Sequence, residues 1–334
     1  MAEYIIRRII WLFVVLFAVS LITFALMHAV PGGPFSQEKK LPQEIIDNLN
    51  RKYHLDEPLW QQYVRYMSDI LIPRYNAGEL STDHRSDYLV TIQVGDGNLQ
   101  WMNFGPSYAS KTRTVNDIFR DNLKVSAQLG VLAIMVGSII GIPLGILAAL
   151  RQNTIVDYTA MAIAIIGVSI PAIVSGPIFQ WLFAVQLGWF PVAGWGSPEN
   201  AVLPALVLGL GTSALLARLT RASLLQVIRE DYIRTARAKG LRESTITVRH
   251  ALKNSLIPVV TVYGPLLAAL ITGTFVVETI FGIPGMGRYF VNSISNRDYT
   301  VIMGTILLYS VLLVIANMFV NIVYAFLDPR IRLN

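Results

Sequence analysis

The feature that most constrains the fold of this chain is a series of long apolar segments separated by polar connections. An α-helix needs about 20 apolar residues to cross roughly 30 Å of hydrocarbon, and it satisfies its backbone hydrogen bonds internally. Only 14% of the residues are charged, whereas soluble domains have about 25%. The pattern predicts an all-α polytopic membrane protein with six transmembrane helices. The expected spans cover residues 9–30, 125–150, 158–187, 202–216, 258–280 and 300–327.

The first span is expected to remain in the mature protein with its N-terminus in the cytoplasm. Arg7 and Arg8 precede the apolar residues, and positive charge favours the inner side of the membrane. The segment is longer than the apolar part of a cleaved signal peptide, which is the alternative interpretation. An even number of spans returns the C-terminus to the same side, where Arg330 and Arg332 again carry positive charge. Both termini are therefore predicted to be cytoplasmic.

The spans divide the chain into three regions. These are an N-terminal transmembrane helix at 1–30, an extracytoplasmic segment at 31–115, and a five-helix core at 116–334 with a cytoplasmic loop at 219–257. The extracytoplasmic segment is polar, and a segment of that length can be translocated regardless of its positive charges. It is expected to contain helices at 43–53 and 57–71, a strand at 88–94 and a turn at 95–98.

The loop at 219–257 is long and basic. With the adjacent Arg218 it carries nine Arg or Lys residues against three acidic ones, which is typical of a cytoplasmic connection. Apolar residues recur at helical spacing from Leu224 to Thr235 and predict an amphipathic helix. Gly240 is expected to end this helix in the left-handed conformation, and a second helix is expected at 243–255. A basic amphipathic loop can also simply lie on anionic headgroups, which is the alternative.

The order of residues in this loop favours a more specific interpretation. The string DYIRTARAKGL is followed, ten residues after its glycine, by HALKNSLIP. Together they resemble the cytoplasmic loop of permease subunits of binding-protein-dependent ABC importers, in the branch that carries dipeptides, oligopeptides and nickel. Only Ala236, Gly240 and Leu252 match the general motif of that family, whereas the whole string resembles the version found in the peptide branch. The strings GWFPVAGW and VETIFGIPGMGRYF resemble the same branch.

The resemblance covers nearly the whole chain except residues 75–101, which look inserted. A spacer or lid is the simplest role for that region, and contact with an external binding protein is the more specific alternative. The resemblance implies the type I permease fold of ABC importers, located in the cytoplasmic (inner) membrane. It also implies transport of dipeptides, oligopeptides or a related small solute such as nickel. The implied partners are a second homologous permease, two cytoplasmic ATPase subunits, an extracytoplasmic solute-binding protein and membrane lipid.

The resemblance further implies that the chain is not an enzyme and holds no cofactor, because ATP and Mg²⁺ are bound by the ATPase subunits. Its short helix at 230–239 would dock on one ATPase and transmit the closure of the ATPase pair to the spans. Gly240 would fix the angle to the following helix. The residues implied in coupling are Asp231, Tyr232, Ile233, Arg234, Thr235, Ala236, Arg237, Lys239, Gly240 and Leu241.

Small and polar residues within the spans predict contacts between helices. Gly137, Gly141 and Gly145 recur every four residues, which allows another helix to approach closely, although a translocation wall is an alternative. Asn317 and Asn321 lie one turn apart and are expected to hydrogen-bond a neighbouring helix. Pro143, Pro171 and Pro177 interrupt apolar runs and are expected to kink the helices that contain them.

Glu278 is an acidic residue at the end of an expected span. A carboxylate inside hydrocarbon costs about 2.5 to 3.5 kcal/mol on insertion scales, so such a residue often marks a transport pathway or gate. Because Glu278 lies at the end of the apolar run, an interfacial and solvated position is the first expectation. A contact with the substrate or a gate is the alternative.

Several other functions lack sequence support. The chain has no G-x-x-x-x-G-K-[ST] phosphate loop, no G-x-S-x-G nucleophile motif, and no spacing of its four histidines that suits a metal. The basic loop contains one aromatic residue, Tyr232, and lacks the interleaved aromatic residues that nucleic-acid binding would need, which argues against nucleic acid as a partner. A secondary transporter or channel that works without ATP is the main alternative to an ABC permease, and a membrane enzyme or receptor is a more remote one. An inverted repeat would favour a secondary transporter, and none is evident.

Overall fold

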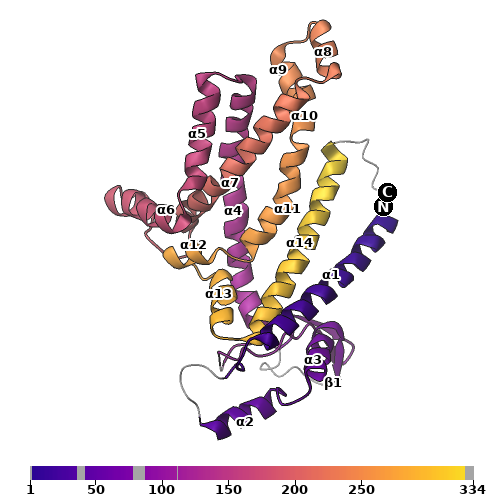
Figure 1. The fold of residues 1–334 in the computed structure, drawn as a ribbon. Helices are drawn as coiled ribbons and strands as arrows, with labels where there is room; N and C mark the ends of the chain where they lie inside the picture. Colours follow the sequence, from indigo (N-terminus) through magenta and orange to yellow (C-terminus); the bar gives the residue numbers. More distant parts are fainter. Residues whose placement is uncertain (1, 36–41, 78–86, 111, 328–334) are drawn as a thin grey trace. The chain divides into compact units, whose positions relative to one another are not determined.

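The computed structural model describes residues 2–35, 42–77, 87–110 and 112–327. The chain forms two compact units. Figure 1 labels most of the helices that make them up. Unit 1 comprises the residues up to Arg8, then Val125–Pro284, and the chain from Leu312 onward. Unit 2 comprises Ile9–Lys124 and Gly285–Val311. Three long helices, α1 (Ala2–Ala29), α4 (Val115–Leu150) and α14 (Tyr299–Leu327), each contribute to both units.

Unit 2 combines most of α1 (Ala2–Ala29) with the polar segment that follows it. That segment forms α2 (Gln43–Lys52), α3 (Leu59–Leu71) and a three-stranded antiparallel sheet. The strand order is β1 (Arg74–Ala77), β3 (Gly97–Trp101), β2 (Val90–Val94). α13 (Gly287–Ser295) completes the unit. The expected helices and the strand at 88–94 are therefore present, whereas β1 and β3 were not predicted. Residues 78–86 of the region that looks inserted lie outside the described residues.

One carboxylate helps to hold the polar segment of unit 2 to the start of α14. Asp298 accepts hydrogen bonds from the hydroxyl of Ser107 and from the backbone N–H groups of Tyr108 and Ala109. The Asp298 residue is 2% exposed, and a buried carboxylate needs several such donors to offset its lost hydration. Beside it, Gly304 on α14 lies against Val115 and Phe119, where an added Cβ would come within 2.7 Å of Val115.

Unit 1 is a bundle of helices joined by short turns. α4 leads through a turn at residues 151–154 to α5 (Ile155–Ser169), which continues as α6 (Ala172–Phe179) and a π-helix, η2 (Gln180–Gln186). α7 (Pro198–Val227) then returns along α4 and α5. The basic loop forms α8 (Asp231–Ala238), α9 (Glu243–Thr245), a π-helix η3 (Ile246–Ala251) and α10 (Leu252–Ser255). α11 (Ile257–Ile271) and the short α12 (Phe275–Ile280) follow.

Glycines on α4 allow α7 to pack at very short distance. A Cβ added to Gly141 would lie 2.5 Å from the backbone oxygen of Ser213, and one added to Gly145 would lie 2.5 Å from that of Ala217. Gly137 faces the backbone of Gly209 in the same way, at 3.2 Å. The expectation that this glycine repeat serves helix packing is confirmed.

Among the described residues, four helices are long and apolar enough to cross a membrane, in α1, α4, α7 and α14. Two further pairs of helices meet the same test jointly but are bent. The pair α5 and α6–η2 is bent by 98°, and the pair 243–255 and α11 is bent by 46°. The structure therefore has four candidate spans, or six if each bent pair forms one span.

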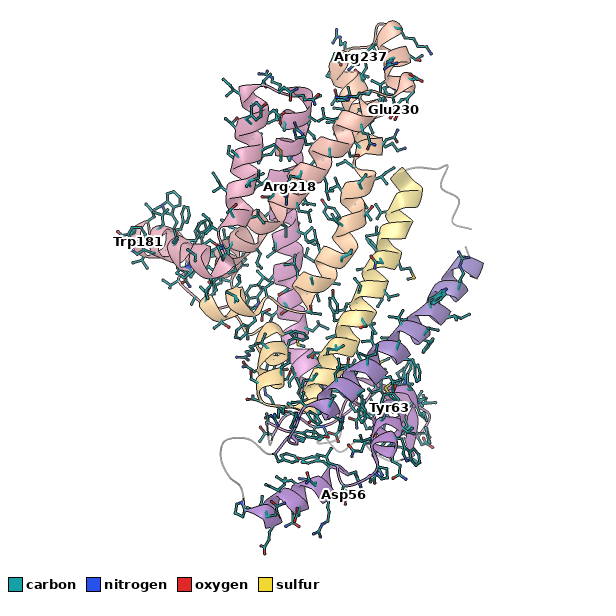
Figure 2. The ribbon with its side chains drawn as sticks, in the orientation of Figure 1. Asp56, Tyr63, Trp181, Arg218, Glu230 and Arg237 are labelled. Atoms are coloured by element: carbon teal, nitrogen blue, oxygen red, sulfur yellow. The ribbon has the colours of Figure 1, made fainter. Side chains whose placement is uncertain are left out.

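The bend between α5 and α6 confirms the expected kink at Pro171 and gives the span expected at 158–187 the form of a bent pair. Ile170 is extended (φ −94°, ψ 112°) and Pro171 follows it, so the helix ends at Ser169 and restarts at Ala172. A residue before proline is disfavoured in the helical conformation, which explains the break. Figure 1 shows α6 running across the direction of α5, and Trp181, which is 57% exposed, lies on this crosswise segment (Figure 2).

Two other spans differ from their expected limits. α7 extends to Val227, so residues 219–227 of the expected loop continue the helix of the fourth span. The fifth helix ends at Ile271 rather than near residue 280, because Gly273 adopts a positive φ of 108° and turns the chain before α12. The expected single amphipathic helix is also divided, since residues 228–230 form a turn between α7 and α8.

Candidate functional site

The basic loop folds onto one apolar cluster at the ends of α4 and α7. Ile233 and Ala236 on α8 are 0% and 7% exposed, and they pack on this cluster. Helical spacing of three residues places both side chains on one face of α8. The buried members of the cluster are Ala149, Leu224, Ile233, Ala236, Ile246 and Ala251. α8 is therefore fixed to the two long helices through its apolar face.

The opposite face of α8 is polar and open. The side chains of Asp231 and Arg234 are 96% and 71% exposed and form an ion pair at 3.3 Å. Ion pairs this exposed contribute little to stability, typically about 0 to 1 kcal/mol. The exposed residues of the predicted coupling set are Asp231, Tyr232, Arg234, Thr235, Arg237, Lys239, Gly240 and Leu241. This face has the residues and the accessibility to receive a partner protein.

Burial changes the role expected for two members of that set. Ile233 was expected to supply an apolar contact to an ATPase, but its side chain is inside unit 1. Ala236 faces the same way. Both residues anchor α8 rather than contribute to its exposed face, and Tyr232, which is 42% exposed, remains as the apolar surface of the helix.

Gly240 ends α8 as the sequence predicts. Its φ is +74°, and the N–H groups of Gly240 and Leu241 donate to the carbonyls of Arg237 and Ala236 at 2.9 and 3.4 Å. These two bonds form the glycine-dependent cap that commonly ends helices. The prediction of a left-handed residue at this position is confirmed, and it sets the direction in which the chain leaves α8.

Two side-chain contacts hold α8 to the helices after the turn. Arg237 donates to Glu243 on α9 at 2.8 Å, and Asn254 on α10 donates to the hydroxyl of Tyr232 at 2.8 Å. Glu243 and Asn254 were not among the predicted coupling residues. Their partners lie six and 22 residues away, so the contacts exist only once the turn at Gly240 has formed. Sequence spacing alone has no signal for them.

Glu278 lies in the interior of unit 1, which corrects the expectation of a solvated, interfacial residue. It is 1% exposed and accepts a hydrogen bond from the hydroxyl of Ser126 at 2.7 Å. The turn at Gly273 is the cause, because it directs α12 back against α6 and α7 instead of continuing the span outward. Glu278 therefore lies in a hydrogen-bonded buried position that is separate from α8.

The asparagine pair is described in part. Asn317 on α14 lies against Gly264 on α11, where an added Cβ would come within 2.5 Å of the Asn317 amide oxygen. This contact places Asn317 against a neighbouring helix, and the expected hydrogen bond stays a prediction. The side chain of Asn321 lies outside the described residues.

Family models match this chain over most of its length. Residues 141–333 match the binding-protein-dependent transport system inner membrane component, and residues 1–84 match the N-terminal part of such membrane components. The chain belongs to this family. It is therefore a permease component of a transport system in the inner membrane rather than an enzyme, as the resemblance of its basic loop implied.

Known relatives match the chain from end to end. It is 42% identical to the dipeptide transport system permease protein DppB of Bacillus subtilis, over 100% of this chain and 99% of that protein. It is 39% identical to the oligopeptide transport system permease protein OppB of Salmonella typhimurium, over 99% of this chain and 100% of that protein.

A solved structure shares the fold of this permease. A chain of the MetNI methionine ABC transporter, in an inward-facing conformation, superposes with a TM-score of 0.53. The match covers 63% of this chain and 96% of that chain at 19% identity. The helical architecture of ABC importer permeases is therefore present here.

Proposed function

We propose that this chain is the permease subunit of an ATP-driven importer of dipeptides or oligopeptides. The observation that carries the proposal is the identity of 42% and 39% to a dipeptide and an oligopeptide permease over essentially the whole chain. The names of these relatives favour peptides over nickel as the solute. Transport without ATP has no comparable support, because the chain belongs to the family of binding-protein-dependent transport system components.

The assembly follows from this function. Six spans would be completed by the two bent helix pairs, with both termini in the cytoplasm and the polar segment at 31–115 outside. A second homologous permease would share the pathway, two ATPase subunits would hold ATP and Mg²⁺, and an extracytoplasmic solute-binding protein would deliver the peptide. Lipid would cover the exposed apolar side chains of α1, among them Trp11, Phe13 and Phe17, which are 56% to 60% exposed.

Coupling would pass through α8. Its open face would dock on one ATPase through polar residues and Tyr232, while Ile233 and Ala236 fix it to the ends of α4 and α7. Closure of the ATPase pair on ATP would then move α8 and these two helices together. A ligand shifts a conformational equilibrium only if it binds the two states with different affinity. For this movement to drive transport, nucleotide binding must therefore favour one packing of the spans over the other.

Reconstitution tests the proposal directly. The chain is purified in mild detergent from its native membrane, and the proteins that accompany it are identified by mass spectrometry. We expect ATPase subunits and a second permease among these proteins. When the complex is reconstituted in liposomes with its ATPases facing the lumen, we expect peptide uptake to require ATP in the lumen. A chain that is recovered alone and transports solute without ATP would be a secondary transporter instead.

Charge reversal of Asp231 tests the docking face. The side chain of Asp231 is 96% exposed, so Asp231→Arg should leave folding intact while it reduces recovery of ATPase subunits with the permease. The matched control is Glu199→Arg, an equal charge change at an exposed position at the start of α7. Equal recovery of ATPase with both variants would remove α8 as the docking helix.

A further inference from the structure

A second feature of unit 1 is a cavity of about 470 Å³ beside the basic loop. It lies between the α4–α5 turn at residues 151–154, the end of α7, and the segment from α8 to α9. Figure 1 shows the α4–α5 turn and α8 at the same end of the unit, and Figure 2 shows Arg237 there. The coupling role proposed above involves one lining residue, Arg237, but leaves the cavity itself without a function.

The cavity is lined by an excess of positive charge. Arg151, Arg229 and Arg237 face it together with one carboxylate, Glu243, so the lining carries a net charge of +2. Glu243 is engaged by Arg237 at 2.8 Å. Arg229 has a long contact of 3.5 Å to the side-chain oxygen of Gln152. In the part of the chain that the structure describes, neither Arg151 nor Arg229 forms an ion pair with a carboxylate.

The floor of the same cavity is apolar. Ala149, Leu150, Leu225 and Ile228 contribute to it. Two helices that qualify as membrane spans end here, α4 at Leu150 and α7 at Val227. The apolar run of α4 ends at Leu150, and such a run ends where the roughly 30 Å of hydrocarbon gives way to the lipid headgroups. The cavity therefore combines guanidinium groups with apolar side chains at the end of the apolar run of α4.

We propose that this cavity binds the headgroup of an anionic phospholipid. Guanidinium groups match phosphate geometry through paired N–H donors, and basic pockets between helices at the cytoplasmic surface are suited to anionic headgroups. A soluble phosphate would use the arginines but leave the apolar floor exposed to water. A phospholipid satisfies both parts of the lining.

Such a lipid would connect the α4–α5 turn to the segment that joins α7 to α8. Arg151 belongs to the α4–α5 turn, Arg229 lies in the turn that joins α7 to α8, and Arg237 lies on α8 itself. A phosphate shared by these groups would hold α8 to the ends of the long helices more firmly. ATP-driven transport would then depend on the fraction of anionic lipid, a consequence that rests on the coupling role proposed for α8. Lipid binding itself does not rest on that role.

Binding is tested on the purified full-length permease with a fluorescent short-chain phosphatidylglycerol as the probe. The test variant is Arg151→Gln/Arg229→Gln, which leaves the predicted coupling residue Arg237 in place. The matched control is Arg242→Gln/Arg249→Gln, which removes two exposed arginines of the basic loop that do not line the cavity. With about fivefold for each basic residue near an anionic surface, we expect the test variant, which loses two, to bind about 30-fold more weakly than wild type. The control should bind as wild type does.

The competing occupants give different results. Equal affinity of the test variant and wild type would overturn the proposal. Competition by inorganic phosphate or ATP as effective as that by phosphatidylglycerol would assign the cavity to a soluble anion and also overturn it. If the test variant loses ATPase subunits during purification in detergent without anionic lipid, the arginines contact the ATPase and the lipid site is wrong.

The assembled importer tests the consequence. In phosphatidylcholine liposomes with a rising share of phosphatidylglycerol, ATP-driven uptake by wild type should rise severalfold, whereas the test variant should stay at the level seen without phosphatidylglycerol. A wild-type response shared by the test variant would overturn the regulatory role of the site. If wild type takes up no peptide in any lipid, the proposed transport function fails, and the binding titration still decides the lipid site.

Discussion

Substitution of Gly240 by valine is expected to uncouple ATP hydrolysis from transport while leaving membrane insertion intact. Gly240 has a φ of +74°, and an added Cβ would meet no atom within 4 Å. The effect therefore comes from backbone strain and not from a steric clash. A left-handed conformation costs an L-residue about 1 to 2 kcal/mol, and a β-branched side chain lies at the upper end.

The valine variant could instead leave the left-handed conformation, and this change costs about as much. If the backbone rotates to a negative φ, the bonds from the N–H groups of Gly240 and Leu241 are lost, at about 1 kcal/mol each. Either route costs roughly 2 kcal/mol, which corresponds to about a 30-fold change in an equilibrium constant. That is enough to change the direction in which the chain leaves α8 but small against a total stability of about 5 to 15 kcal/mol.

The assay measures ATP hydrolysis and peptide uptake by the same proteoliposomes. For Gly240→Val we expect ATP hydrolysis to continue and the uptake per ATP to fall severalfold. Gly240→Asn is the control, because asparagine tolerates the left-handed region and should retain most of the coupling. Wild-type uptake per ATP in the valine variant would refute the reasoning. Equal losses in both variants would show that glycine matters here for a reason other than its φ.

Three further substitutions test how unit 1 is held together. Gly141→Ala should destabilise the purified permease by roughly 1 to 3 kcal/mol, because its Cβ would lie 2.5 Å from a backbone oxygen of α7. Gly211→Ala, where a Cβ meets nothing within 4 Å, should be neutral or stabilising, and thermal unfolding in detergent compares the two. Asp157→Asn should cost about 3 kcal/mol, since Asp157 is 1% exposed and pairs with Arg221 at 2.7 Å, and an unchanged melting temperature would contradict this. Glu278→Gln should keep its hydrogen bond and near-normal uptake if the residue is structural, whereas a well-folded variant without uptake would place Glu278 in the pathway.

Features of the fold that depend on local signals could be predicted from the sequence. The long apolar runs identified α1, α4 and α14, because a helix that crosses a membrane must have about 20 consecutive apolar residues. Gly240 ended an amphipathic segment and proved to be the left-handed cap of α8. The glycine repeat from Gly137 to Gly145 marked the face of α4 that α7 approaches, because only a residue without Cβ permits that distance.

Features that depend on tertiary contacts could not be predicted. The apolar run at 158–187 does not predict the angle of the 98° bend, although Pro171 marks the place of the break. Strands β1 and β3 are short, and β3 begins at Gly97, a residue type that is typical of turns. Glu278 is buried because the chain reverses at Gly273, and nothing in its immediate sequence distinguishes a solvated carboxylate from one that reaches Ser126.

The division of α8 into two faces explains how one short helix could serve both anchoring and docking. An eight-residue helix has little stability of its own in water, so its order must come from contacts with the rest of the protein. Ile233 and Ala236 provide that order by packing into the cluster that also contains Leu224 of α7 and Ala149 of α4. A partner that pushes on the exposed face therefore acts on α4 and α7 together, and these two helices are in turn joined along the glycines of α4. Displacement of α8 alone would require exposure of Ile233, which costs about 1.5 to 3 kcal/mol for a fully buried aliphatic side chain. Movement of α8 with both helices avoids that cost, and this difference makes a concerted motion the favoured response.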